Sequence, residues 1–87
     1  MRQSWRLDLE NKERWAAVGF VYLEDGRYSS IFLKPYPHDR PTAPGDWVMI
    51  ANHRKLGAAK RAVESYASRK EFFPVKRGIR ISRWETG

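Results

Sequence analysis

The sequence contains no cysteine, so the chain can form neither a disulfide bond nor a thiolate metal site. No apolar run approaches the roughly 20 residues that a membrane-spanning helix needs. Nor does the hydrophobic segment of a signal peptide follow the first six residues. We therefore expect a cytoplasmic protein without a membrane partner. Its 87 residues are enough for one domain, which we take to be residues 1–87.

Motifs for catalysis are equally scarce. The serines occur in no Gly-x-Ser-x-Gly context, and the six glycines form no phosphate-binding loop. His38, Asp39, Asp46 and His53 have side chains that can hold a metal ion, but their spacing matches no known ligand set. We therefore predict no enzymatic activity, no cofactor and no metal site.

Aromatic residues are plentiful at 14 % of the chain, which favours a folded domain over a disordered segment. Charge is plentiful too, but it is unevenly distributed. Residues 1–51 contain seven basic and seven acidic residues, whereas residues 52–87 contain ten basic and three acidic ones. The second segment therefore carries the entire net charge of +7. Such an asymmetry indicates a polyanionic partner such as nucleic acid, with a merely solubilising surface as the alternative.

Apolar periodicity predicts a β-meander over residues 1–34. Residues 4–10 alternate strictly, and residues 14–24 and 27–34 flank Asp25-Gly26, a strong signal for a two-residue hairpin. With that loop, one face of the hairpin carries apolar side chains at positions 15, 17, 21, 23, 28 and 32, and the other at 18, 20, 22, 31 and 33. Because both faces are apolar, the helix, the long loop, a second copy or a partner must cover the second one.

The remaining segments complete the predicted fold. Residues 35–46 contain four prolines and read as a loop, either functional or strapped over the sheet. Residues 47–51 read as a short strand, with the start of a helix as the alternative. Residues 52–71 show helical periodicity with Asn52 as a plausible N-cap, and residues 75–84 read as a final strand. The prediction is an α+β fold, a small antiparallel sheet of four to five strands with one basic amphipathic helix packed on one face.

Three segments carry a resemblance to a known family. Residues Arg14–Val18, Asp25–Tyr28 and Ala58–Ala67 together resemble the arm-binding domains of phage integrases. The likeness covers residues 14–67 and implies a sheet that reads the DNA major groove, in a protein of a mobile genetic element. The proline-rich segment and the basic final strand depart from that pattern, and the first hairpin is neutral where a groove-reading sheet is basic. No base-contacting residue is therefore carried over.

The predicted function is non-enzymatic binding of DNA or RNA through the phosphate backbone, because Lys and Arg on one surface neutralise phosphates. The predicted contacts lie on the helix and the final strand: Arg54, Lys55, Lys60, Arg61, Arg69, Lys76, Arg77, Arg80, Arg83 and, as a stacking platform on the face of Arg80, Trp84. The alternative for Trp84 is a core position at the sheet edge. The alternative function is a protein-binding adaptor, or a phage- or plasmid-encoded inhibitor such as an anti-defence protein, that uses an aromatic sheet surface and forms a homodimer.

Overall fold

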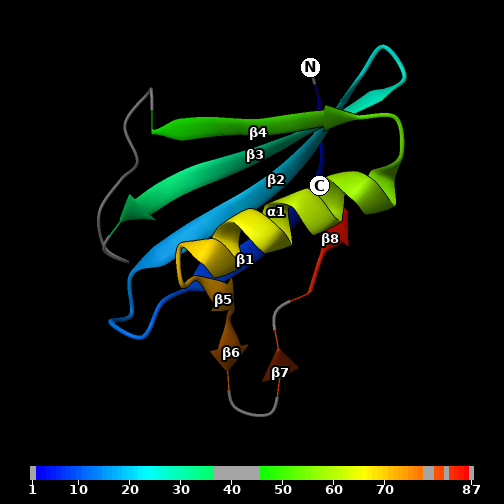
Figure 1. Cartoon of the computed structure of the whole chain (residues 1–87). Helices are drawn as coiled ribbons and strands as arrows, with labels where there is room; N and C mark the ends of the chain where they lie inside the picture. Colours follow the sequence, from blue (N-terminus) through cyan, green and yellow to red (C-terminus); the bar gives the residue numbers. More distant parts are fainter. Residues whose placement is uncertain (1, 37–45, 78–79, 82, 87) are drawn as a thin grey trace.

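The computed structural model describes residues 2–36, 46–77, 80–81 and 83–86, and it confirms the α+β fold class. Five strands form an antiparallel sheet in the order β4-β3-β2-β1-β5, and a sixth, β8, also pairs with β1. One helix, α1, crosses one face of this sheet (Figure 1). The elements are β1 Arg2–Glu10, β2 Ala16–Glu24, β3 Arg27–Tyr36, β4 Trp47–His53, α1 Leu56–Arg69, β5 Phe73–Pro74, β6 Lys76–Arg77, β7 Arg80–Ile81 and β8 Glu85–Thr86.

The β2–β3 hairpin has the predicted register. Asp25 and Gly26 both have positive φ, 52° and 74°, as the type I′ turn of a two-residue hairpin requires. Glu24 pairs with Arg27 and Gly19 with Phe32. Because directly opposed residues share a face, this register produces the two apolar faces that the sequence predicts.

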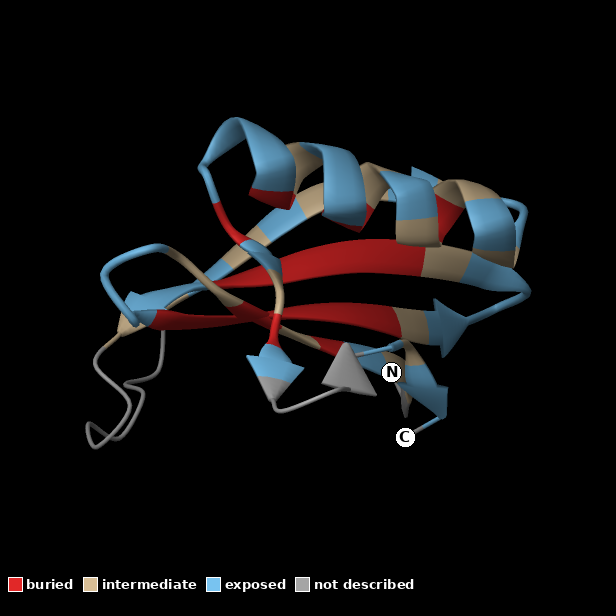
Figure 2. Ribbon diagram, turned by 90° about the horizontal axis from the view of Figure 1, so that it is seen from below, coloured by how far each residue is buried: buried red, intermediate tan, exposed pale blue. Residues whose placement is uncertain are grey.

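The core between α1 and the sheet is built from one of these faces. Val21 and Phe32 lie on it, and the buried helix residues Ala59, Val63 and Ala67 pack against it (Figure 2). Gly19 sits beneath the helix, because a Cβ at this position would overlap Cγ1 of Val63. The missing side chain therefore sets how closely α1 approaches β2.

The second apolar face lies on the other side of the sheet and is covered at its centre within one chain. Its central members, Val18, Phe20, Ile31 and Leu33, are all buried. Tyr22 and Tyr36 pack against this cluster, and the ring of Trp47 lies 4.9 Å from that of Phe20. Apolar surface stays exposed at the β4 edge, where Trp47 and Met49 are 41 % and 57 % exposed, and at Phe73 in β5, which is 53 % exposed.

The predicted helix start at residue 52 is wrong. The strand expected over 47–51 continues to His53, and α1 begins at Leu56 with Lys55 as its N-cap. Asn52 is held in the sheet instead, where its amide donates to Ser29 Oγ (3.0 Å) and accepts from Arg27. Tertiary hydrogen bonds to β3 thus outweigh the capping preference of this residue. The helix also ends earlier than the predicted residue 71, at Arg69.

The predicted final strand over residues 75–84 is wrong as well. Lys76 pairs with Ile81 and Arg77 with Arg80, so the chain reverses inside this segment. Gly78 is the sequence signal for such a reversal. Two short flanking strands, β5 and β8, complete the sheet against the outer edge of β1.

The predicted loop over residues 35–46 is shorter than expected, because β3 includes Pro35 and Tyr36 and the Lys34 N–H donates to the Asp46 carbonyl (2.7 Å). Residues 37–45 lie outside the described part of the chain. No helix in the described ranges is long and apolar enough to cross a membrane.

Candidate nucleic-acid interface

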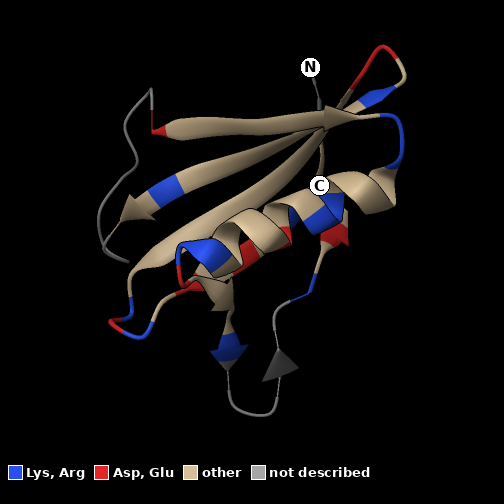
Figure 3. Ribbon diagram, in the orientation of Figure 1, with Lys and Arg blue, Asp and Glu red and all other residues tan. Residues whose placement is uncertain are grey.

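The helix layer, which is α1 and the turn before it, carries five of the ten predicted contacts. Arg54 and Lys55 form the turn that leads into α1, and both are exposed. Arg61 and Arg69 are exposed along the helix, and Lys70, which was not among the predicted contacts, is exposed directly after it. We call these five basic residues the helix row: Arg54, Lys55, Arg61, Arg69 and Lys70. At a rise of about 1.5 Å per residue, the row from Lys55 to Arg69 spans roughly 21 Å. Figure 3 shows these basic groups at both ends and in the middle of the helix layer.

The N-terminal end of α1 concentrates positive potential. Lys55 is extended (φ −118°, ψ 138°) and makes no side-chain capping hydrogen bond, and the first turn contains no acidic residue. The partial positive charge of the helix terminus therefore adds to the charges of Arg54 and Lys55. Arg61 folds back toward this end, because its Nη1 lies 3.4 Å from where a Cβ of Gly57 would stand.

Lys60 faces a different environment. Its ammonium lies 5.0 Å from the ring of Trp5 and 5.8 Å from that of Trp84, in cation–π contact with both. The indole N–H of Trp84 donates to Glu64 Oε1 (2.6 Å). Lys60 is therefore half-buried between two tryptophans beside a carboxylate, and it is less accessible to phosphate than Arg61.

Trp84 is half-buried and packs against both core clusters under the helix. The structure thus places its ring at the β1 side of the core, as the alternative interpretation expected. The side chain of Arg80, proposed to share its face, lies outside the described part of the structure. Base stacking on Trp84 therefore stays a prediction.

The predicted contacts near the C-terminus lie apart from the helix row. Lys76 and Arg83 are exposed, and the backbones of Arg77 and Arg80 pair in the β6–β7 hairpin, whose side chains at these two positions are not described. Figures 1 and 2 show that this hairpin projects from the β1 edge, on the side away from α1. The ten predicted residues therefore do not form one surface: five lie in α1 or directly before it, and five lie within residues 76–84.

Ion pairing separates the two halves of the sequence. The salt bridges found in the described part of the chain join Arg6 to Asp8 (3.0 Å) and Arg14 to Glu10 (3.5 Å). Both lie within residues 1–51, which carry no net charge and which we call the neutral half. No salt bridge joins a described basic residue of the helix row to a carboxylate. Arg69 and Lys70 instead lie over the ring of Tyr66, at 6.0 and 5.8 Å. The positive charge of this row is thus available to an external anion.

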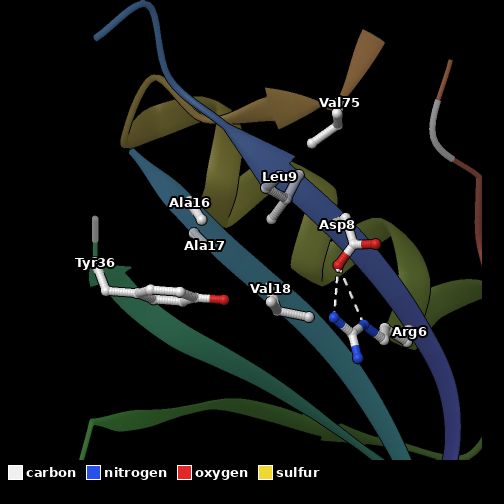
Figure 4. Close-up of a pocket in the computed structure, with 8 residues that line it drawn as sticks. All are labelled: Arg6, Asp8, Leu9, Ala16, Ala17, Val18, Tyr36 and Val75. Carbon is white, nitrogen blue, oxygen red and sulfur yellow. Dashed lines mark hydrogen bonds and ion pairs between the residues drawn. The ribbon is translucent and has the colours of Figure 1, made fainter. Parts of the chain in front are cut away.

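A pocket of about 270 Å³ opens on the sheet side away from the helix (Figure 4). The Arg6–Asp8 pair forms one wall, and the hydroxyl of Tyr36 points into it from the other. The remaining lining residues are Leu9, Ala16, Ala17, Val18 and Val75. Asp8 accepts two hydrogen bonds from Arg6, so the charged groups of this pair satisfy each other. The lining residues include no nucleophile paired with a base.

Sequence reasoning missed Trp5 as a partner of Lys60, because residues 5, 60 and 84 meet only in three dimensions. In the described ranges, no three His, Asp or Glu side chains are close enough to hold a metal ion. Comparison with known proteins finds no matching family model, no similar curated protein and no similar solved structure.

Proposed function

We propose that this protein is a non-enzymatic nucleic-acid-binding domain that contacts the phosphate backbone through the outer surface of α1. The observation that supports this most directly is the row of exposed basic side chains, Arg54, Lys55, Arg61, Arg69 and Lys70, that no carboxylate neutralises within the described chain. Phosphate contacts of this kind are independent of sequence and weaken as salt rises. The proposal therefore concerns backbone binding and specifies no base.

The geometry favours the N-terminal half of the row as its strongest part. Arg54, Lys55 and Arg61 converge where the helix terminus adds its own partial positive charge. Two acidic residues, Glu64 and Glu71, interrupt the C-terminal half. Lysine and arginine in the β6–β7 hairpin supply a second, separate group of contacts in this proposal.

The test is a salt series with short duplex and single-stranded DNA and RNA, measured by fluorescence anisotropy. Each neutralised phosphate contributes about 0.9 to the slope of log K against log salt on duplex DNA. The Arg61→Gln/Arg69→Gln double variant should reduce that slope by about 1.8, because both groups are exposed and bind no carboxylate among the described residues.

A matched control separates the loss of charge on the helix surface from the loss of positive charge elsewhere in the protein. Lys12→Gln/Lys34→Gln removes two exposed charges from the neutral half and should leave the slope unchanged. The double variant Lys76→Gln/Arg83→Gln reports separately on the basic residues that follow β5. Absence of binding at ~50 mM salt, where backbone binding is strong, or equal losses in the test and control variants, overturns the proposal.

A second candidate function, protein binding through the sheet, is supported by a narrower surface than the sequence suggested. The central side chains of the second apolar face are buried within one chain, and the exposed apolar pair nearest to them is Trp47 and Met49 at the β4 edge. Loss of a partner on replacing Trp47 and Met49, with nucleic-acid binding intact, would favour this function.

A further inference from the structure

The two edges of the sheet differ. Along β1, the outer edge is covered by β5 and by β8 from the C-terminal end of the chain. Along β4, no strand in the described ranges pairs with the outer edge (Figure 1). A strand in this position presents unpaired backbone N–H and C=O groups to any neighbouring chain.

The β4 edge also lacks the features that usually prevent such pairing. Its seven residues, Trp47–His53, include no Lys, Arg, Asp, Glu or Pro. Met49 and Trp47 are among the most exposed large apolar side chains described. Charged residues and prolines are the common means of blocking an edge, and an exposed apolar edge without them is a pairing site.

One irregularity in β4 indicates which strand can pair with it. Met49 lies opposite Ile31 and Ala51 opposite Ser30, so Ile50 is the extra residue of a β-bulge. Trp47 and Met49 therefore lie on the sheet face away from α1, the open face. Ile50 and Ala51 lie on the face that α1 covers, the helix face, and Asn52 lies on the open face again. In a regular partner strand the side chains alternate between faces at every residue, so they would no longer share faces with those of β4 beyond the bulge. A second β4, turned by a two-fold axis between Ile50 and Ala51, keeps opposed side chains on the same face. Met49 then lies opposite Asn52, and Ile50 lies opposite Ala51.

Charges at the ends of β4 favour the same arrangement. Asp46 precedes the strand, and Arg54 and Lys55 follow it. In the two-fold arrangement, Asp46 of one copy lies opposite Lys55 of the other, and this contact occurs twice. A parallel pairing would bring like charges together instead, so the edge is complementary to an antiparallel copy of itself.

We infer that the β4 edge binds a second copy of this chain, by antiparallel β4–β4 pairing about a two-fold axis between Ile50 and Ala51. The two sheets then become continuous, and both helices lie on the same side of the combined sheet. The contact is small, so the dimer should dissociate on dilution in the micromolar range.

The first experiment measures molecular mass by sedimentation equilibrium on nuclease-treated protein, from about 1 to about 300 µM, a range suited to a small interface. The mass should rise from 10.3 kDa toward twice that value. Met49→Lys should leave the protein monomeric, since it places a charge on the edge. Trp15→Lys is the matched control, because Trp15 is as exposed as Trp47, at 41 %, but lies in the β1–β2 connection.

A charge exchange tests the register. Asp46→Lys should weaken dimerisation about tenfold, because two attractive contacts become repulsive. Adding Lys55→Asp to it should restore the wild-type dissociation constant. Circular dichroism and thermal melting confirm that each variant is folded.

A protein that is monomeric at every concentration overturns the inference, and so does a dimer that Met49→Lys leaves unchanged. A dimer that Met49→Lys dissociates but the charge exchange does not restore overturns the two-fold register. Because the protein is nuclease-treated and no nucleic acid is added, these results are independent of the proposed function.

Discussion

Single side chains decide how closely the helix and the sheet approach each other. Gly19 is the clearest case, since a Cβ there would overlap Val63 Cγ1, which lies on the buried face of α1. Gly57 is the contrasting case, because a Cβ there would meet only the flexible side chain of Arg61 at 3.4 Å. Identical substitutions at these two glycines should therefore have opposite effects.

Gly19→Ala should lower the free energy of unfolding by about 1–3 kcal/mol, the usual cost of overpacking a core. Gly57→Ala should raise it by up to about 1 kcal/mol, because alanine is the better helix former. Urea denaturation followed by circular dichroism measures both. A Gly19→Ala variant as stable as the wild type would contradict the close helix–sheet contact.

Tyr22 should make stability depend on pH in the alkaline range. It packs against the buried cluster of the second face, and burial raises the pKa of its hydroxyl above the ordinary 10.0. The unfolded chain then loses this proton at lower pH than the folded chain does. Stability due to the protonated hydroxyl is therefore complete below pH 10 and is lost as pH rises through the higher folded pKa.

Comparing Tyr22→Phe with the wild type isolates this effect. The free energy of unfolding, measured by urea titration at several pH values from about 8 to about 11, should fall less steeply in the variant above about pH 10. Tyr28→Phe is the control at a second half-buried tyrosine. Parallel curves for the wild type and Tyr22→Phe would argue against the raised pKa.

At the scale of elements, the C-terminal end of α1 is held by a specific set of backbone hydrogen bonds. The Phe72 N–H donates to the Ala67 carbonyl (2.9 Å) and the Glu71 N–H to the Ser68 carbonyl (3.0 Å), the pattern of a Schellman motif. Glu71 occupies the left-handed position of this motif, with φ 63°, where glycine is usual. The buried ring of Phe72 anchors the turn beside Ala67.

Glu71→Gly should therefore raise the free energy of unfolding by about 1 kcal/mol, because glycine adopts this conformation without the steric cost of a Cβ. Glu71→Gln separates backbone strain from charge, since it removes the carboxylate and keeps the Cβ. Chemical denaturation of the two variants measures the difference. Equal stabilisation by both would assign the effect to charge instead.

The element scale also shows how far sequence reasoning extends. The Asp25-Gly26 hairpin was predicted to the residue, because turn chemistry and strand alternation are local. The start of the helix was misplaced by four residues, because Asn52 is held by Ser29 and Arg27 on another strand. The reversal within residues 75–84 was missed because two-residue strands carry too little periodicity to be recognised.

For the whole molecule, the net charge of +7 should make folding and binding respond to salt in opposite directions. Between ~0.01 M and ~0.1 M salt, the Debye length falls from about 30 to about 10 Å and screens the repulsion within the helix row. The melting temperature should rise by about 2–4 °C, which corresponds to roughly 0.5 kcal/mol for a domain of this size. Affinity for nucleic acid should fall over the same range.

Thermal melts in sodium chloride measure the first effect, and Arg61→Gln/Arg69→Gln should reduce the rise. Lys12→Gln/Lys34→Gln should leave it close to that of the wild type, because these charges lie in the neutral half. A melting temperature independent of salt would show that the helix row is already compensated.

The candidate site was predicted in part for the same physical reasons. Composition identified the basic half of the chain, since charge is counted residue by residue. Only the fold divided its basic residues between the helix row and the β6–β7 hairpin, and only the fold placed Lys60 between Trp5 and Trp84.

The sequence by itself determined the α+β class, the hairpin register and the segregation of charge, because these follow from local periodicity and residue type. The tertiary structure decided how the second apolar face is covered. It buries Val18, Phe20, Ile31 and Leu33 within one chain and leaves the edge at Trp47 and Met49 exposed. It also left β4 without a partner on its outer side in the described chain. Both outcomes depend on contacts between segments that are far apart in the chain, such as Trp47 against Phe20, and local sequence does not encode such contacts.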